Sequence, residues 1–271
     1  MERRIAFINP FGTAIYDDII RETLVPYALA GTLVDVIHLE GAPANIDYYW
    51  PKHLMEAAVF DLVMRLEEEG YDAIVVGCCY DPGVRVAREL VDVPVVGPLE
   101  AAMNMASYFG HNYTVVTDHR KAVPYLEDLV RLYGGANCRG VRCIDWWVTD
   151  MVQDPAAVAK DAAAECVRAL EEDRSEVVIL GCTIIGGCLE KQIMTTGDYR
   201  DLPVVNPNLL ALKTAETLAD LHRQGKYTIN RRGYYQKQAQ HDAADFEDVR
   251  RRYRLVELEP EHAPEGGPGL S

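Results

Sequence analysis

The sequence has no apolar run near the roughly 18 residues that a membrane-spanning helix needs. Residues 1–12 contain two arginines, but their apolar run is too short for a secretion signal. Basic residues are also scarce, 27 against 42 acidic ones, which gives a formal net charge of -15. A surface of this charge repels nucleic acid and anionic membranes. We therefore expect a cytoplasmic protein with neither nucleic acid nor a membrane among its partners.

Metal-binding and nucleotide-binding motifs are missing as well. The seven cysteines form no Cys-x-x-Cys pair and have no histidine pattern beside them, so we expect no metal site. An odd number of cysteines without a secretion signal indicates reduced thiols. The glycines form no phosphate-binding loop, and we expect no cofactor. The cysteines are Cys78, Cys79, Cys138, Cys143, Cys166, Cys182 and Cys188.

What the sequence does contain is a steady alternation of short β-branched segments and amphipathic stretches. Strands are expected at 4–9, 33–39, 73–77, 93–97, 113–117, 141–144, 177–181 and 202–206. Helices are expected at 14–30, 54–69, 83–91, 99–109, 121–133, 155–172, 185–196 and 207–223. Four of the strands are nearly continuous apolar runs, which is typical of parallel strands covered on both faces. The alternation therefore predicts an α/β fold.

Two segments of the chain repeat one pattern of strand, Gly-Cys, helix and a Pro-Val-Val strand. In this repeat Gly77-Cys78 corresponds to Gly181-Cys182. We predict two pseudo-symmetric αβ lobes with mainly parallel sheets and an interlobe active-site cleft. The first lobe spans 1–97, with the helix at 207–224 packing back on it, and the second spans 98–206.

The carboxyl-terminal residues have a different composition. Residues 225–258 are rich in Arg and Tyr, and we expect an arm that packs on the surface or on a partner subunit. Residues 259–271 are rich in Pro, Gly and Glu, which favours a disordered tail. A homo-oligomer formed through the arm is one expected arrangement.

Cys78 and Cys182 are the candidates for chemistry. In a parallel sheet, ligands bind beyond the carboxyl ends of the strands, where both cysteines are expected. We expect each to begin a helix, whose terminus lowers a thiol pKa. One thiolate can then remove the proton of a small-molecule carbon acid while the other thiol protonates the opposite face. A covalent thiolate mechanism, giving an isomerase, a lyase such as a decarboxylase, or a hydrolase or desulfurase on a related heterocycle, is the alternative. A non-enzymatic small-molecule binding protein is a third possibility.

Neighbouring residues have two interpretations each. Asp81, followed by Pro82 and Gly83, is expected to cap the helix after Cys78 or to contact the substrate. His119 lies near the site or in a solvated loop. Trp147, with Trp146, forms a pocket wall or packs in the interior.

The segments Cys78–Gly83 (Cys-x-x-Asp-Pro-Gly), PVVGPLEAA, YTVVT, LGCT and PVVN together resemble the Asp/Glu/hydantoin racemase superfamily. The match is closest to its hydantoin racemase branch, and it covers about residues 4–222. The resemblance implies a cofactor-independent racemase or epimerase of a hydantoin-like or amino-acid-like carbon acid, usually an oligomer.

The resemblance also implies roles for single residues. Cys78 and Cys182 are the acid/base pair. Asn9 and Thr117, at strand ends, contact the substrate, and Thr183 offers a backbone N–H. Tyr80 is counted with the substrate-binding residues, as is Cys79, for which packing is the alternative.

Overall fold

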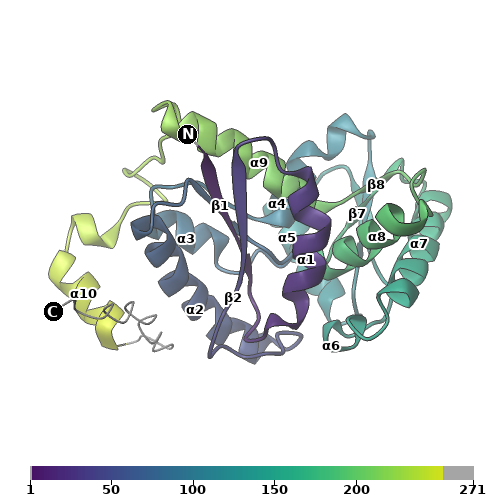
Figure 1. The fold of residues 1–271 in the computed structure, drawn as a ribbon, viewed down its shortest axis with the longest axis horizontal. Coiled ribbons are helices and arrows are strands. Elements are labelled where there is room, and N and C mark those ends of the chain that lie inside the picture. Colours follow the sequence, from purple (N-terminus) through teal and green to yellow (C-terminus); the bar gives the residue numbers. More distant parts are fainter. Residues whose placement is uncertain (1, 253–271) are drawn as a thin grey trace, which may run out of the picture.

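The computed structural model describes residues 2–252 and contains two parallel sheets (Figure 1). The strands are β1 (Arg3–Asn9), β2 (Thr32–His38), β3 (Ala73–Val76), β4 (Val95–Val96), β5 (Tyr113–Thr117), β6 (Cys138–Cys143), β7 (Val177–Leu180) and β8 (Val204–Val205). The first sheet has the order β2-β1-β3-β4 and the second the order β6-β5-β7-β8. Every strand pair in both sheets is parallel. The same order recurs four strands later, so the predicted α/β fold with two related lobes is confirmed.

Helices connect the strands and cover the sheets. They are α1 (Asp17–Leu24), α2 (Tyr49–Glu68), α3 (Val84–Leu90), α4 (Pro98–Met105), α5 (Ala122–Leu132), α6 (Val148–Met151), α7 (Pro155–Glu172), α8 (Thr183–Thr196), α9 (Pro207–Arg223) and α10 (Ala243–Arg252). Short 3₁₀ turns lie at Ala14–Tyr16, Val25–Tyr27, Ala106–Tyr108 and Gln238–Gln240. On the first sheet, α1 packs with α9, and α2 packs with α3. On the second sheet, α7 packs with α8, and α5 lies against β6.

The structure changes some predicted boundaries. The stretch 14–30 is not one helix, because the α-helix ends at Leu24 and Pro26 has no N–H to continue its hydrogen bonding. α2 begins at Tyr49, five residues before its expected start, with Pro51 in the first turn, where a missing N–H costs nothing. The four-residue α6 was not predicted, since so short a helix leaves no periodic pattern.

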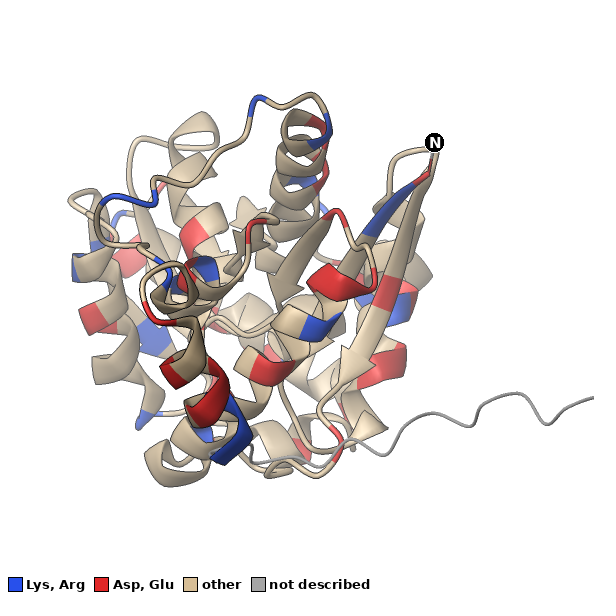
Figure 2. Ribbon diagram, turned by 90° about the vertical axis from the view of Figure 1, so that its left-hand side faces the viewer, with Lys and Arg blue, Asp and Glu red and all other residues tan. Residues whose placement is uncertain are grey.

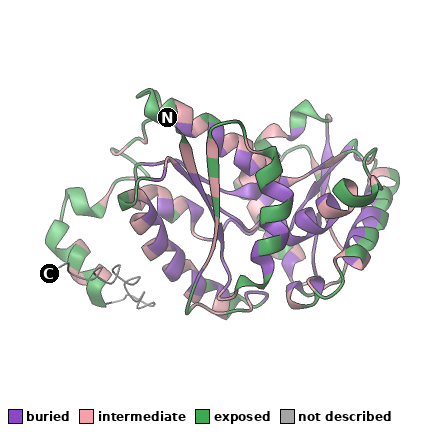
Figure 3. Cartoon of the chain, viewed as in Figure 1, coloured by how far each residue is buried: buried purple, intermediate pink, exposed green. Residues whose placement is uncertain are grey.

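The strands lie in the hydrophobic core, as their apolar sequences predict. All residues of β3, β5 and β7 are buried (Figure 3). β2 is the edge strand of the first sheet, and its residues alternate between exposed and half-buried from Thr32 to Val36. Burial on both faces of the sheet therefore distinguishes the central strands β3, β5 and β7 from the edge strand β2.

The glycine before each repeated cysteine has no room for a side chain. A Cβ on Gly77 would lie 2.1 Å from a ring atom of Phe7 and 2.7 Å from the carbonyl oxygen of Ile8. A Cβ on Gly181 would lie 2.6 Å from a methyl carbon of Val115. Close packing against the neighbouring strand explains why Gly-Cys recurs in both lobes.

The Gly77→Ala variant is expected to lose about 1–3 kcal/mol of unfolding free energy, because the added methyl overpacks the core. Urea denaturation followed by circular dichroism measures the loss. Gly140→Ala is the control, since nothing lies within 4 Å of its Cβ position and the change should stay within about 0.5 kcal/mol. Equal midpoints for the two variants would contradict the packing argument.

α9 lies against the first sheet although it follows the second in sequence. It contacts β1, β3 and β4. Its Asp220 accepts a hydrogen bond from Arg3 at 2.8 Å, and the buried Glu216 accepts one from the Leu29 N–H at 2.7 Å. These contacts join two segments about 200 residues apart.

Part of the expected carboxyl-terminal arm is described. Arg231 donates to the carbonyls of Arg88 and Val91 at the end of α3 and to the Asp92 carboxylate. α10 follows and has no buried residue. The rest of the expected arm, from 253 to 258, and the expected tail at 259–271 lie outside the described residues.

The chain has more acidic than basic residues, 42 against 27. In Figure 2 the positions of Asp and Glu, coloured red, are spread over many of the helices and loops. Within residues 2–252, none of the helices has both the length and the apolar character needed to span a bilayer.

Candidate functional site

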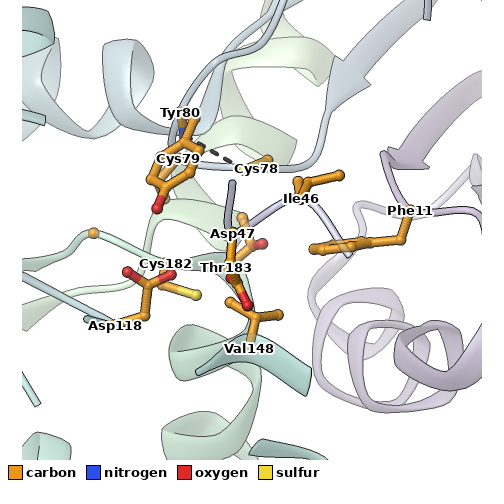
Figure 4. A pocket seen from close by; sticks show the side chains of 11 residues that line it. Phe11, Ile46, Asp47, Cys78, Cys79, Tyr80, Asp118, Val148, Cys182 and Thr183 are labelled. Carbon is orange, nitrogen blue, oxygen red and sulfur yellow. Dashed lines mark hydrogen bonds between the residues drawn. The ribbon is translucent and has the colours of Figure 1, made fainter. Parts of the chain in front are cut away.

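A small pocket lies between the two lobes, at the carboxyl ends of the strands (Figure 4). It encloses about 10 Å³, enough for one water molecule. Residues of the first lobe and residues of the second line it together, and both repeated cysteines are among them. The lining residues are Phe11, Ile46, Asp47, Cys78, Cys79, Tyr80, Asp118, Val148, Gly181, Cys182 and Thr183.

Cys182 lies where the sequence predicts. It follows β7 and Gly181, has an extended backbone with φ -150°, and is the residue immediately before α8. Its side chain is buried, and the N–H groups of Ile184 and Ile185 in the first turn of α8 interact with its sulfur. The second cysteine is therefore at a helix N-terminus, as expected.

Cys78 does not begin a helix, and this part of the prediction is wrong. A turn of five residues separates it from α3, because Asp81 has a φ of 44° and Gly83 a φ of 68°, neither of which continues a helix. Within the turn, the Tyr80 N–H donates to the Cys78 sulfur at 3.5 Å. The two cysteines are thus related by the sheets but have different local backbones.

Asp81 caps a different helix from the one expected. Its carboxylate accepts hydrogen bonds from the N–H groups of Leu99 at 3.1 Å and Glu100 at 2.9 Å, in the first turn of α4. The side chain is buried, and burial raises its pKa to about 7. Asp81 therefore fixes the Cys78 turn to the start of α4.

The expectation of a lowered thiol pKa is also corrected. Burial raises the pKa of Cys78 to about 12, although the Tyr80 N–H favours the thiolate. Burial raises the pKa of Cys182 well above its ordinary value, and the negative charge of Asp118 adds to that shift. For both thiols, burial outweighs the nearby N–H groups, which favour the thiolate. Both sulfurs are free thiols, like the other five cysteines.

Hydrogen bonds across the floor of the pocket join the lobes. Thr183 donates through Oγ1 to the Gly77 carbonyl at 3.0 Å. The Cys79 thiol donates to the Leu180 carbonyl at 3.6 Å. Tyr80 lines the pocket, is buried, and lies 5.0 Å from the Tyr125 ring between centroids. Cys79, Tyr80 and Thr183 thus come together with Cys78 and Cys182.

Asn9 and Thr117 lie at strand ends nearby but do not line the pocket. Asn9 donates through Nδ2 to Asp17 at 2.7 Å, and its Oδ1 is buried without a hydrogen-bond partner. Thr117 donates through Oγ1 to the carbonyl of Gly181 at 3.1 Å. In the structure both side chains are hydrogen-bonded within the protein. Contact of Asn9 and Thr117 with the substrate remains a prediction.

Five lining residues were not selected from the sequence: Phe11, Ile46, Asp47, Asp118 and Val148. Asp118 had a usable signal, because it directly follows the end of β5. Asp47 and Ile46 had no usable sequence signal, because they lie in an irregular segment after β2 that only tertiary packing brings over the cysteines.

His119 is buried beside two carboxylates, so the solvated-loop interpretation is wrong. Its Nε2 lies 3.4 Å from Oδ1 of Asp47 and 4.0 Å from Oδ1 of Asp118. Burial disfavours the protonated ring, but Asp47 and Asp118 outweigh it and raise the pKa of His119. Burial raises the pKa of Asp118 to about 6. The ligand atoms of these three side chains lie within 4.8 Å of one another, which also suits a metal ion.

These buried groups predict a stability that falls as pH rises from 5 to 8. Asp81 and Asp118 have folded pKa values of about 7 and 6, above 3.8, so the folded state holds more protons in this window. The raised pKa of His119 acts in the same direction, because its contribution is present at low pH and lost as pH rises. We expect a loss on the order of 2–4 kcal/mol, measured by urea denaturation.

The Asp118→Asn variant should reduce this pH dependence by about 1 kcal/mol. Asp128→Asn, which alters an exposed carboxylate on α5, should leave it unchanged. A stability that stays level or rises from pH 5 to pH 8 would contradict the assignment.

Aromatic side chains link the lobes beside the pocket. The Tyr48 and Trp147 rings stack with centroids 5.6 Å apart, and the ring of His119 lies 4.4 Å from that of Trp147. Tyr48 follows the lining residue Asp47, and Trp147 precedes the lining residue Val148. We call Tyr48, Trp147 and His119 the aromatic bridge.

The family model described as Asp/Glu/Hydantoin racemase matches residues 5–215. A hydantoin racemase of Pseudomonas sp. (strain NS671) is 33% identical over 235 residues, covering 85% of this chain and 90% of that protein.

Two solved structures are similar along most of their length. Allantoin racemase from Klebsiella pneumoniae has a TM-score of 0.78 and 26% identity, covering 87% of this chain and 94% of that one. Allantoin racemase from Pseudomonas fluorescens has a TM-score of 0.75 and 30% identity, covering 86% and 96%.

Proposed function

The chain belongs to the Asp/Glu/hydantoin racemase family, and from that premise we propose that it racemises a five-membered cyclic ureide of the hydantoin or allantoin type. The observation that carries the proposal is the presence of one cysteine from each lobe, Cys78 and Cys182, in a single pocket. The names of the similar racemases support the substrate class.

We assign the two thiols as acid and base on opposite faces of the substrate. The carbon at position 5 of a hydantoin carries an acidic proton because it lies next to a carbonyl. One sulfur, as thiolate, removes this proton, and the other, as thiol, returns one to the opposite face, which inverts the centre. The reverse direction exchanges the roles of the two residues.

The raised thiol pKa values fit this chemistry. A thiolate with a raised pKa is a stronger base toward a weak carbon acid, although less of it is present at neutral pH. The N–H groups at the start of α8 favour the thiolate of Cys182 and offer donors to a developing enolate oxygen. Holding the substrate in place between the two sulfurs lowers the entropic part of the barrier to proton transfer.

Proton NMR in deuterium oxide tests the proposal. Single enantiomers of several 5-substituted hydantoins and allantoin are incubated with the enzyme near pH 7, beside an enzyme-free control for spontaneous exchange. We expect loss of the position-5 proton signal together with loss of optical activity. A new product without exchange would instead indicate a lyase or hydrolase and overturn the racemase assignment.

A further inference from the structure

The wall of the pocket carries negative charge and no basic side chain. Among the lining residues within 2–252 are two carboxylates, Asp47 and Asp118, and no lysine or arginine. Their relative exposures are only 2% and 3%. Burying carboxylates away from water is costly unless a partner compensates them.

The cationic side chains of the protein neutralise the charge of these two carboxylates only in part. Within residues 2–252, His119 is the basic side chain found within 4.0 Å of both carboxylates, and one imidazolium balances one negative charge. Lys52 is committed to Glu56 at 2.7 Å, and Lys121 lies 4.0 Å from the centroid of the Tyr49 ring. Neither lysine lines the pocket.

One acceptor atom in the wall has no hydrogen-bond partner. Oδ2 of Asp47 is buried and unpaired, whereas Oδ1 of Asp118 accepts from the N–H of His119. Figure 4 shows both carboxylates on the same pocket as Cys78 and Cys182. A buried acceptor of this kind is stabilised by a donor that a ligand brings.

The chemistry of the wall distinguishes among hydantoin substituents. Phe11, Ile46 and Val148 form an apolar surface for a hydrocarbon stem. At the end of such a stem, an ammonium or guanidinium group makes a charge-assisted hydrogen bond to Asp47. A carboxylate there is repelled by both acids.

We infer that the pocket selects hydantoins whose position-5 substituent ends in a positively charged group, and that Asp47 binds this group. The inference rests on the proposed racemisation of hydantoins and names the substrate class of the same pocket. Asp47 is in this sense a residue that determines specificity, and the acid/base chemistry stays with Cys78 and Cys182.

The test uses three hydantoins of similar length with aminopropyl, butyl and carboxyethyl substituents at position 5. Racemisation of each single enantiomer is followed by chiral chromatography, and kcat/KM is compared. For the wild type we expect the aminopropyl compound to exceed the butyl compound by about tenfold, and the carboxyethyl compound to be slowest. In Asp47→Asn the ratio of aminopropyl to butyl should fall to about one. Asp18→Asn, which alters an exposed carboxylate on α1, should keep the wild-type ratio.

The outcomes separate the two proposals. If the butyl or carboxyethyl compound is racemised as fast as the aminopropyl compound, racemisation stands and the charge preference is overturned. If the preference is present but survives intact in Asp47→Asn, Asp47 is not the binding residue. If none of these three hydantoins, allantoin or the other hydantoins tested is racemised, the proposed function itself fails, and the inference fails with it.

Discussion

Replacement of either Cys78 or Cys182 by serine is expected to lower racemisation in both directions by about a thousandfold or more. A serine hydroxyl is a much weaker acid than a thiol and a poor proton donor and acceptor near neutral pH. Each variant still keeps one sulfur on one face of the substrate. Cys78→Ser and Cys182→Ser should therefore retain exchange of the position-5 proton for opposite enantiomers, measured by NMR in deuterium oxide.

The control is Cys143→Ser, which removes a half-exposed thiol of β6 away from the pocket and should keep wild-type rates. Mass spectrometry of enzyme incubated with substrate completes the experiment. A covalent adduct on Cys78 or Cys182 with no proton exchange in either variant would replace the two-base mechanism by a covalent one.

Removing the ring of Trp147 is expected to raise the alkylation rate of Cys78 and Cys182 by iodoacetamide about tenfold or more. The pocket encloses only about 10 Å³, and the aromatic bridge lies beside its lining residues Asp47 and Val148, so we expect a reagent or substrate to enter more readily once the bridge has separated. Trp147→Ala removes the stack with Tyr48 and the contact with His119, and so favours the open state. Peptide mapping by mass spectrometry gives the rate at each cysteine.

Trp50→Ala provides a matched comparison, because that ring is 75% exposed on α2 and should not affect alkylation. Faster alkylation in Trp147→Ala confined to Cys138 or Cys143 would point to general loosening and not to the bridge. Unchanged rates at the two pocket cysteines would show that entry follows another route.

Much of the fold was predictable because the central strands carry a local signal, whereas β6 (CRGVRC) begins three residues before its expected start at 141. β3, β5 and β7 are short, β-branched and apolar on both faces, which is sufficient to predict parallel strands under helices. The repeat of Gly-Cys after β3 and β7 then indicated two related lobes. The boundaries proposed for the lobes, the oligomeric state and the cytoplasmic location stay predictions.

The site was predictable only in part. The repeat identified Cys78 and Cys182, but the backbone after Cys78 depends on Asp81 binding the start of α4, a contact between residues 18 apart. The thiol pKa values depend on how tightly the lobes close over the sulfurs, which no local pattern encodes. Asp47 comes from a segment without secondary structure, and its partner His119 lies 72 residues further along the chain.

The position of α9 affects the order in which the two lobes can complete their folding during synthesis on the ribosome. The second sheet and the helices that pack on it, among them α4, lie within residues 98–206, so we expect that lobe to fold as soon as its own segment has emerged. The first sheet is synthesised earlier but must wait for α9, which ends at Arg223, to cover β1, β3 and β4. During that interval one apolar face of the nascent chain stays open to chaperones, and the lobe translated first is the lobe completed last.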